Sequence, residues 1–97
     1  MKEIFLNFCL KNNVKIAKFL LKLKIIDVNT LFENNNTALH LVLQKTYKTV
    51  SPETQKMIDL LISAGANISL TNSEGNNVMH IAANIDITYL IEVLLKK

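Results

Sequence analysis

Two histidines, His40 and His80, stand in similar surroundings and could support the widest range of chemistry in this chain. His40 lies in TALHLVL (residues 37–43) and His80 lies in NVMHIAA (residues 77–83). A histidine can ligate a metal, transfer a proton or hold a structural hydrogen bond. A metal site requires several ligands that converge with carboxylates or thiolates. One histidine in each of two similar segments favours a structural role for both, with metal binding as the alternative.

The other reactive residue types form no catalytic arrangement. Gly65 and Gly75 are the only glycines, which are too few for a phosphate-binding loop. The aspartates and serines belong to separate segments and form neither a carboxylate pair nor a serine–histidine pair. Cys9 lies in an apolar segment, where we expect a buried and unreactive thiol. We therefore expect no enzymatic activity, no cofactor and no metal.

The length and composition predict one small domain in a reducing compartment. The chain has 97 residues, which we treat as a single domain over 1–97, and its one cysteine cannot form an internal disulfide. All 11 basic residues are lysines, and nucleic-acid binding usually relies on arginine, so we expect no nucleic-acid partner. No apolar run is long enough to cross a bilayer, and we expect no membrane partner. We expect a cytoplasmic protein or, since the abundant lysine, asparagine and isoleucine are typical of AT-rich genomes, one delivered into a host cytosol as an effector.

Periodicity and capping signals predict helices separated by polar turns. We expect two helices within residues 3–24, broken at Asn12 and Asn13, because asparagine tolerates the left-handed conformation. Thr37 caps the next helix, and Ser51 with Pro52 begins another that ends at Gly65. That helix is predicted to bury Met57, Ile58, Leu61 and Ile62, and further helices are expected over 78–84 and 87–97.

The first two helices show apolar and basic rows at helical spacing. The apolar rows consist of Ile4, Leu6, Phe8 and Leu10, and of Ile16, Phe19, Leu20 and Leu23. The basic row consists of Lys11, Lys15, Lys18 and Lys22. The basic row indicates either a solvated outer surface or a binding face.

The segment AGANISLTNSEGNNVMHIAA (residues 64–83) resembles the ankyrin repeat over its whole length. Gly65 and Ala66 stand in the Gly-Ala place of that family, Gly75 in its turn glycine, and NVMH in its Thr-Pro-Leu-His box. IIDVNTLFENNNTALHLVL (residues 25–43) is similar, with Thr37 and His40 in the box and Asn35 in place of the glycine. The N-terminal repeat resembles the family less, because KIIDVN (residues 24–29) lacks the Gly-Ala and is one residue longer than the corresponding stretch after the later helix.

The resemblance implies an all-α solenoid of about three repeats, over residues 1–29, 30–69 and 70–97. It implies that Thr37, His40, Gly65, Gly75 and His80 are structural, with each imidazole bound to neighbouring turn backbone. The histidines lie 40 residues apart, whereas the family period is about 33, and we place the excess at residues 46–52. That insertion is either a tolerated surface loop or a contact loop carrying Tyr47.

What the resemblance implies for function is protein–protein recognition through turn tips and the concave face of the inner helices. Exposed apolar residues on a turn suggest a contact, and Leu31 and Phe32 stand at such a tip. The alternative is that Phe32 folds back onto the atypical first repeat. The candidate partner-binding residues are Leu31, Phe32, Gln44, Lys45, Tyr47, Asn84 and Ile85.

Other interpretations stay open at this point. The chain could be the targeting part of a larger protein, an effector or an enzyme, or a weak binder of anionic surfaces through its lysines. Apolar residues of the last helix, Val93, Leu94 and Leu95, have no later repeat to cover them, which suggests a homo-oligomer contact as a further alternative.

Overall fold

The computed structural model describes residues 2–46 and 51–82, and within them all regular structure is helical. The predictions for Tyr47, for Asn84 and Ile85, and for a last helix over 87–97 lie outside the described residues. The α-helices are α1 (Lys2–Leu10), α2 (Val14–Lys22), α3 (Ala38–Lys45), α4 (Pro52–Ser63) and α5 (Val78–Ala82), with a short 3₁₀ helix η1 (Glu33–Asn35). None of the described helices is long and apolar enough to span a membrane.

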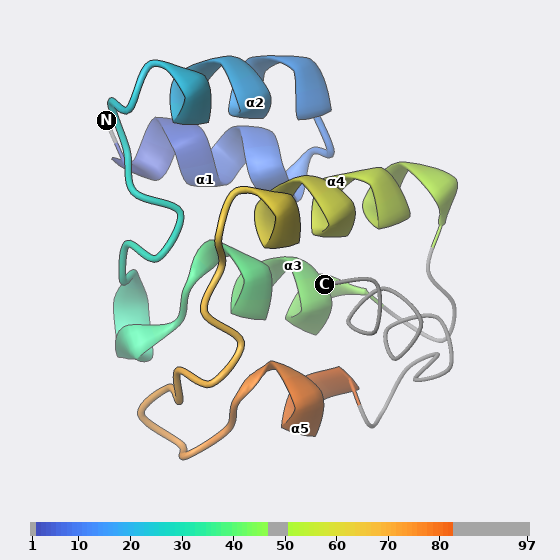
Figure 1. Cartoon of the computed structure of the whole chain (residues 1–97). Helices are drawn as coiled ribbons and strands as arrows, with labels where there is room; N and C mark the ends of the chain where they lie inside the picture. The colour runs from blue at the N-terminus through green and yellow to red at the C-terminus, as the bar shows by residue number, and fades with distance from the viewer. Residues whose placement is uncertain (1, 47–50, 83–97) are drawn as a thin grey trace.

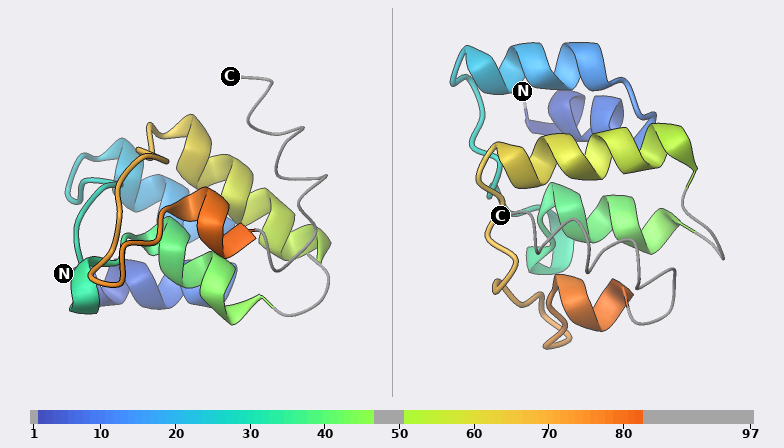
Figure 2. Two further views of the ribbon diagram at one scale, coloured as in Figure 1. Left: turned by 90° about the horizontal axis from the view of Figure 1, so that it is seen from below. Right: turned by 45° about the vertical axis from the view of Figure 1, so that its right-hand side comes forward.

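The helices stack in layers, and the first two layers are antiparallel helix pairs (Figure 1). The first layer is α1 with α2, the second is α3 with α4, and α5 packs on α3. Contacts between layers join α1 to α3 and α2 to α4, so that α1, α3 and α5 form one column and α2 and α4 form another. Figure 2 shows the same order of layers from two further directions.

Local capping interactions fix where the helices begin, as the sequence predicted. The Thr37 hydroxyl accepts a hydrogen bond from the His40 backbone, and Ser51 does the same for Thr54 with Pro52 in the first turn. The break between α1 and α2 contains Asn12 at φ 58°, and its neighbour Asn13 caps α2. Gly65 follows α4 at φ +100°, a conformation that side-chain-bearing residues rarely adopt.

The core lies between the layers and includes the predicted face of α4. Met57, Ile58, Leu61 and Ile62 are buried there. From the other helices the core takes Phe5, Cys9, Ala17, Leu39, Val42, Leu43, Val78 and Ala82.

The faces predicted for the first two helices need correction. Helix α1 buries Phe5 and Cys9, whereas Ile4 is exposed. Helix α2 buries Ala17, while Ile16, Phe19 and Leu23 of the predicted apolar row face solvent. Apolar residues cover more than half of the circumference of α2, so their spacing does not select one face, and the small Ala17 allows the closest approach to the neighbouring helices.

Two loops connect the layers and repeat one backbone pattern: the first connecting loop (residues 23–37) and the second connecting loop (residues 64–77). In the first, Phe32 N–H donates to the Asn36 carbonyl, and in the second Asn72 N–H donates to that of Asn76. Their left-handed positions also correspond, with Asn35 at φ 58° and Gly75 at φ 78°. The two loops therefore repeat at an offset of 40 residues.

The start of the first connecting loop is one residue longer than that of the second, as the sequence indicated. Lys24 at φ 60° occupies the place that Gly65 holds after α4, because each N–H bonds back to the preceding helix. From Lys24 to Asp27 is three positions, whereas from Gly65 to Asn67 is two. A lysine in this conformation stores strain that a glycine avoids.

Candidate protein-binding surface

His40 links the second layer to the loop that follows it. Its ring is fully buried, and Nδ1 accepts a hydrogen bond from Thr37 N–H at 3.1 Å, with the Thr37 hydroxyl at 2.7 Å. Because Nδ1 is an acceptor, the ring proton is on Nε2, which donates to the Asn76 carbonyl at 3.1 Å. The imidazole therefore connects α3 to the second connecting loop, which is the structural tie that the sequence predicted.

His80 repeats the local part of this arrangement with asparagine in place of threonine. Its Nδ1 accepts from Asn77 N–H at 3.0 Å, and Asn77 Oδ1 accepts from His80 N–H at 3.0 Å. The residue is exposed, unlike His40. The same four-residue box thus supports a buried link in one layer and a solvent-facing ring in the other.

Side-chain amides join the two connecting loops along their length. Asn29 donates to the Gly65 carbonyl at 3.2 Å and accepts from Asn67 N–H at 2.7 Å. Buried Asn72 donates to Asn36 Oδ1 at 2.9 Å, and Gln44 donates to the same oxygen at 3.1 Å. One backbone bond, from Ser73 N–H to the Asn34 carbonyl at 2.8 Å, completes the join. These bonds hold the loops in a fixed relation to each other and to α3.

The described part of the chain holds no group of three or more histidine, cysteine or carboxylate side chains that could bind a metal ion. Cys9 is a buried free thiol in α1. Burial raises the pKa of Cys9 to about 12, so that the thiol stays protonated at neutral pH. The thiolate is the nucleophilic form, and this cysteine is therefore unsuited to nucleophilic or redox chemistry.

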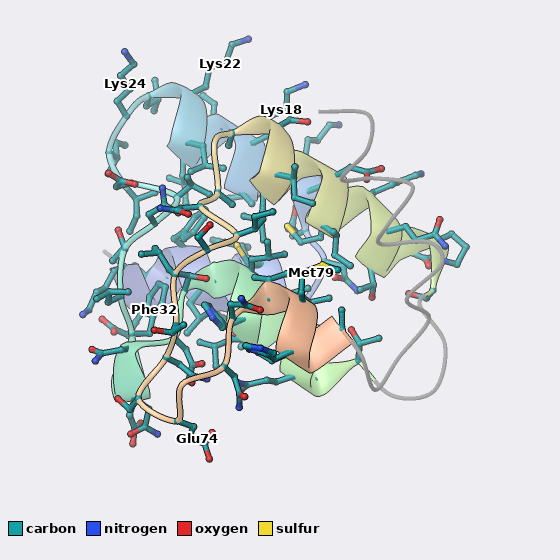
Figure 3. All side chains as sticks on the ribbon, turned by 60° about the horizontal axis from the view of Figure 1, so that its bottom comes forward. Lys18, Lys22, Lys24, Phe32, Glu74 and Met79 are labelled. Carbon is teal, nitrogen blue, oxygen red and sulfur yellow. The ribbon has the colours of Figure 1, made fainter. Side chains whose placement is uncertain are left out.

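Phe32 is not the exposed contact residue that its place on a turn tip suggested. Only 8% of its surface is exposed, and it belongs to the core cluster. The Lys2 ammonium of α1 lies 5.7 Å from the centre of the ring and donates to the Leu31 carbonyl at 3.2 Å. The alternative interpretation, that Phe32 folds back onto the first layer, is the one that the structure shows. Figure 3 labels Phe32 within the first connecting loop.

The remaining candidate contact residues in the described ranges are exposed. Leu31, immediately before Phe32, has 44% of its surface exposed. Gln44 and Lys45 are exposed at the end of α3, and the bond from Gln44 to Asn36 places this end of α3 against the first connecting loop. Leu31, Gln44 and Lys45 therefore remain candidates.

The tips of the two connecting loops add exposed polar residues that the sequence analysis did not single out. Glu33 and Asn34 stand at the tip of the first loop, and Ser73 and Glu74 stand at that of the second. Glu74 points away from the body of the molecule in Figure 3. In both loops these residues directly precede the left-handed turn residue, Asn35 or Gly75, and this repeated position in the sequence could have identified them. The exposed loop surface consists of these four residues together with Leu31, Gln44 and Lys45.

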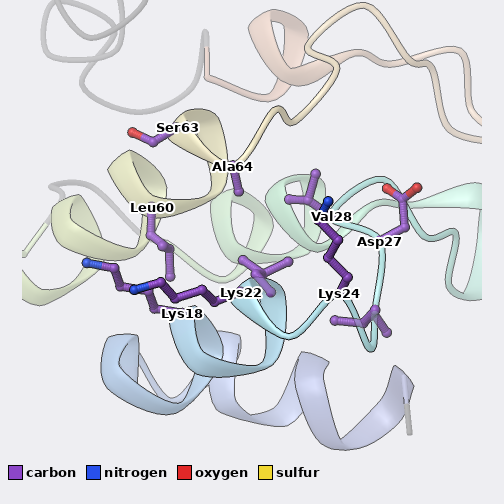
Figure 4. Close-up of a pocket in the computed structure, with 10 residues that line it drawn as sticks. Lys18, Lys22, Lys24, Asp27, Val28, Leu60, Ser63 and Ala64 are labelled. Atoms are coloured by element: carbon purple, nitrogen blue, oxygen red, sulfur yellow. The ribbon is translucent and has the colours of Figure 1, made fainter.

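A second surface feature lies between the C-terminal ends of α2 and α4. An open cavity of about 580 Å³ is lined by α2, the start of the first connecting loop and the last turn of α4 (Figure 4). Leu21, Ile26, Val28 and Leu60 supply its apolar lining, and Lys18, Lys22, Lys24 and Asp27 its charged groups. Asp27 is the one carboxylate among the lining residues, so the cavity has no carboxylate pair.

Comparison with known proteins gives no relative from which a role could be transferred: no family model, curated protein or solved structure matches this chain.

Proposed function

We propose that this chain is an ankyrin-repeat module that binds a partner protein through its exposed loop surface and the adjoining end of α3. The observation that carries the proposal is the repeated unit itself. A helix pair, a connecting loop with a left-handed tip residue and a threonine- or asparagine-capped helix with histidine at its third position recur along the chain. The tips of the connecting loops and the histidines repeat at an offset of 40 residues.

Two features support an ankyrin-type solenoid as the architecture. His40 joins its own layer to the next loop, as the structural histidine of the resembling box is expected to do. Among the described helices, the main contacts lie within a layer or between adjacent layers, as expected for a repeat protein.

Protein binding follows from the character of the exposed loop surface. It offers an exposed leucine beside carboxylates, amides and a lysine on loops whose relative positions are fixed by hydrogen bonds. A rigid surface loses little conformational entropy on binding, and a mixed apolar and polar composition is typical of non-obligate interfaces. The proposal excludes catalysis and needs no cofactor.

The test is to immobilise the chain, incubate it with a lysate of the cells that produce it or that receive it, and identify retained proteins by mass spectrometry. A double variant, Leu31→Asp with Lys45→Glu, should weaken binding of a retained partner at least tenfold, about 1.4 kcal/mol. Both side chains are exposed, so thermal stability should hardly change.

Lys15→Glu provides the matched control, because Lys15 is an exposed lysine on α2 at the other side of the stack. The proposal requires full retention by this variant. Retention that survives the double variant, or that is lost with Lys15→Glu alone, would place the protein-binding surface elsewhere.

A further inference from the structure

The outer surface of α2 has a composition unlike the rest of the chain. Residues 14–26, VKIAKFLLKLKII, consist only of lysine and apolar residues. Residues 11–26 contain five of the 11 lysines and none of the eight acidic residues. The remaining six lysines and eight acidic residues give the rest of the chain a net charge of −2, against +5 for this segment.

Two rows of exposed side chains run along α2. At about 100° per residue, Ile16, Phe19 and Leu23 lie within about 60° of one another around the helix axis. Lys15, Lys18 and Lys22 form a second row within a similar arc, about 100° from the first. Ala17 marks the buried side, and both rows face away from it.

The apolar row is exposed to an extent that a solvated surface does not require. The exposed fractions are 37% for Ile16, 56% for Phe19 and 52% for Leu23, and Ile25 just after the helix reaches 47%. Ile16, Phe19 and Leu23 form a continuous row on the helix rather than scattered single residues, and Ile25 follows this row in the chain. The lysines beside them, Lys18, Lys22 and Lys24, project outward from the body of the molecule (Figure 3).

We propose that this face of α2 binds the surface of a membrane that contains anionic lipids, with Phe19 and Leu23 inserted between headgroups and the lysines bound to lipid phosphates. Such binding combines burial of an apolar face at the acyl boundary with attraction of flanking lysines to negative headgroups. Lysine suits this role because its ammonium extends on a long apolar stem that lies along the interface.

The charges and residue types distinguish this occupant from others. A second copy of the chain would bring two faces of charge +5 together, which like-charge repulsion opposes. Nucleic acid would engage the lysines and leave the apolar row uncovered. A folded acidic protein would need directional polar contacts, whereas residues 14–26 offer no side-chain hydrogen-bonding group except lysine.

This inference is independent of the proposed protein-binding function and departs from the expectation that the chain has no membrane partner. That expectation concerned membrane-spanning segments, and the described helices contain none. The exposed row on α2 is the new observation, because the sequence alone did not show which apolar residues face solvent. A protein that lies on a membrane through α2 would keep its connecting loops available to a protein partner.

The experiment is co-sedimentation of the purified chain with vesicles of phosphatidylcholine alone or of phosphatidylcholine containing phosphatidylglycerol, at physiological salt. We expect binding to the anionic vesicles only. Neutralising Lys18→Gln and Lys22→Gln together should weaken it about 25-fold, since each lysine near an anionic bilayer contributes about fivefold. Phe19→Ser with Leu23→Ser should weaken it at least tenfold through lost apolar burial.

Matched controls are Lys45→Gln and Leu31→Ser, which change an exposed lysine and an exposed leucine elsewhere in the molecule and should leave vesicle binding unchanged. Far-ultraviolet circular dichroism should show that all variants fold, because the altered side chains are exposed. Equal binding to neutral vesicles, no binding to anionic vesicles, or binding that is insensitive to the Phe19 and Leu23 changes would each overturn the proposal. If vesicles do not bind and the chain dimerises through this face of α2, the face is a dimer contact instead. If vesicles do not bind and an acidic protein is retained only when this face is intact, the face is a protein-binding site instead.

Discussion

His40→Ala and His80→Ala provide a matched pair, because the two histidines share a local hydrogen-bond box and differ in burial and in the link to the next loop. Removal of the His40 ring leaves the buried Thr37 N–H without its ring acceptor, at a cost of about 1–3 kcal/mol. It also removes the bond to the Asn76 carbonyl, worth about 0.5–1.5 kcal/mol. Asn76 keeps a bond from Asn72 N–H, so its carbonyl stays paired. The expected total loss of stability is about 1.5–4.5 kcal/mol.

The same change at His80 should have a small effect on the free energy of unfolding. The ring is exposed, and water can replace its bond to Asn77 N–H. We expect a loss of less than about 1 kcal/mol, as for an exposed neutral hydrogen bond.

Equilibrium unfolding in urea, followed by circular dichroism at the helix bands, measures both variants against the parent chain. The slopes of free energy against urea should agree, so that a shift of midpoint reports stability alone. Since a domain near this size shifts by about 4–8 °C per kcal/mol, thermal melts should separate the variants clearly. Equal losses for the two histidines, within about 0.5 kcal/mol, would refute the inference that the His40 link between layers contributes to stability.

Three further predictions follow from individual side chains. Phe32→Ala should destabilise the chain by about 3 kcal/mol in the same urea titration, because the ring is part of the core; an unchanged midpoint would contradict its burial. Cys9 should react with an aromatic disulfide reagent only after denaturant is added, since its thiol is buried and its pKa is raised to about 12; rapid labelling of the folded chain would show that it is accessible. Lys24→Gly should stabilise the chain by about 1 kcal/mol, because glycine adopts the left-handed conformation without strain. The control Lys22→Gly, within α2, should destabilise it. A lower free energy of unfolding for both variants would mean that Lys24 is not strained.

Features that depend on neighbouring residues in the chain were predictable from the sequence. The caps at Thr37 and Ser51 and the helix end at Gly65 follow from short-range hydrogen bonding and backbone sterics. The left-handed Asn35 was predictable for the same reason, as was the extra residue in the first connecting loop. The role of His40 followed from the recurrence of its box, which marked a position in a repeated unit.

Features that depend on distant contacts were not predictable from the sequence. The burial of Phe32 depends on α1, which begins 30 residues earlier, and no local pattern near Phe32 indicates it. The orientation of α2 was undetermined because its apolar residues surround most of the helix, and only packing decides that Ala17 faces inward. The exposure of Phe19 and Leu23, and with it the candidate membrane face, follows from that packing.

The amide groups that join the connecting loops make this protein sensitive to slow chemical ageing. Asn29 acts as both donor and acceptor between the loops, much as a peptide group does within a sheet. Deamidation converts such a side chain to a carboxylate, which keeps the acceptor, loses the donor and places a negative charge against the Gly65 carbonyl. At buried Asn72 the same reaction would set a carboxylate against Asn36 Oδ1 in a site with little water. Prolonged warm storage should therefore loosen the join between the loops before it affects the helices, and the damage would not reverse on cooling.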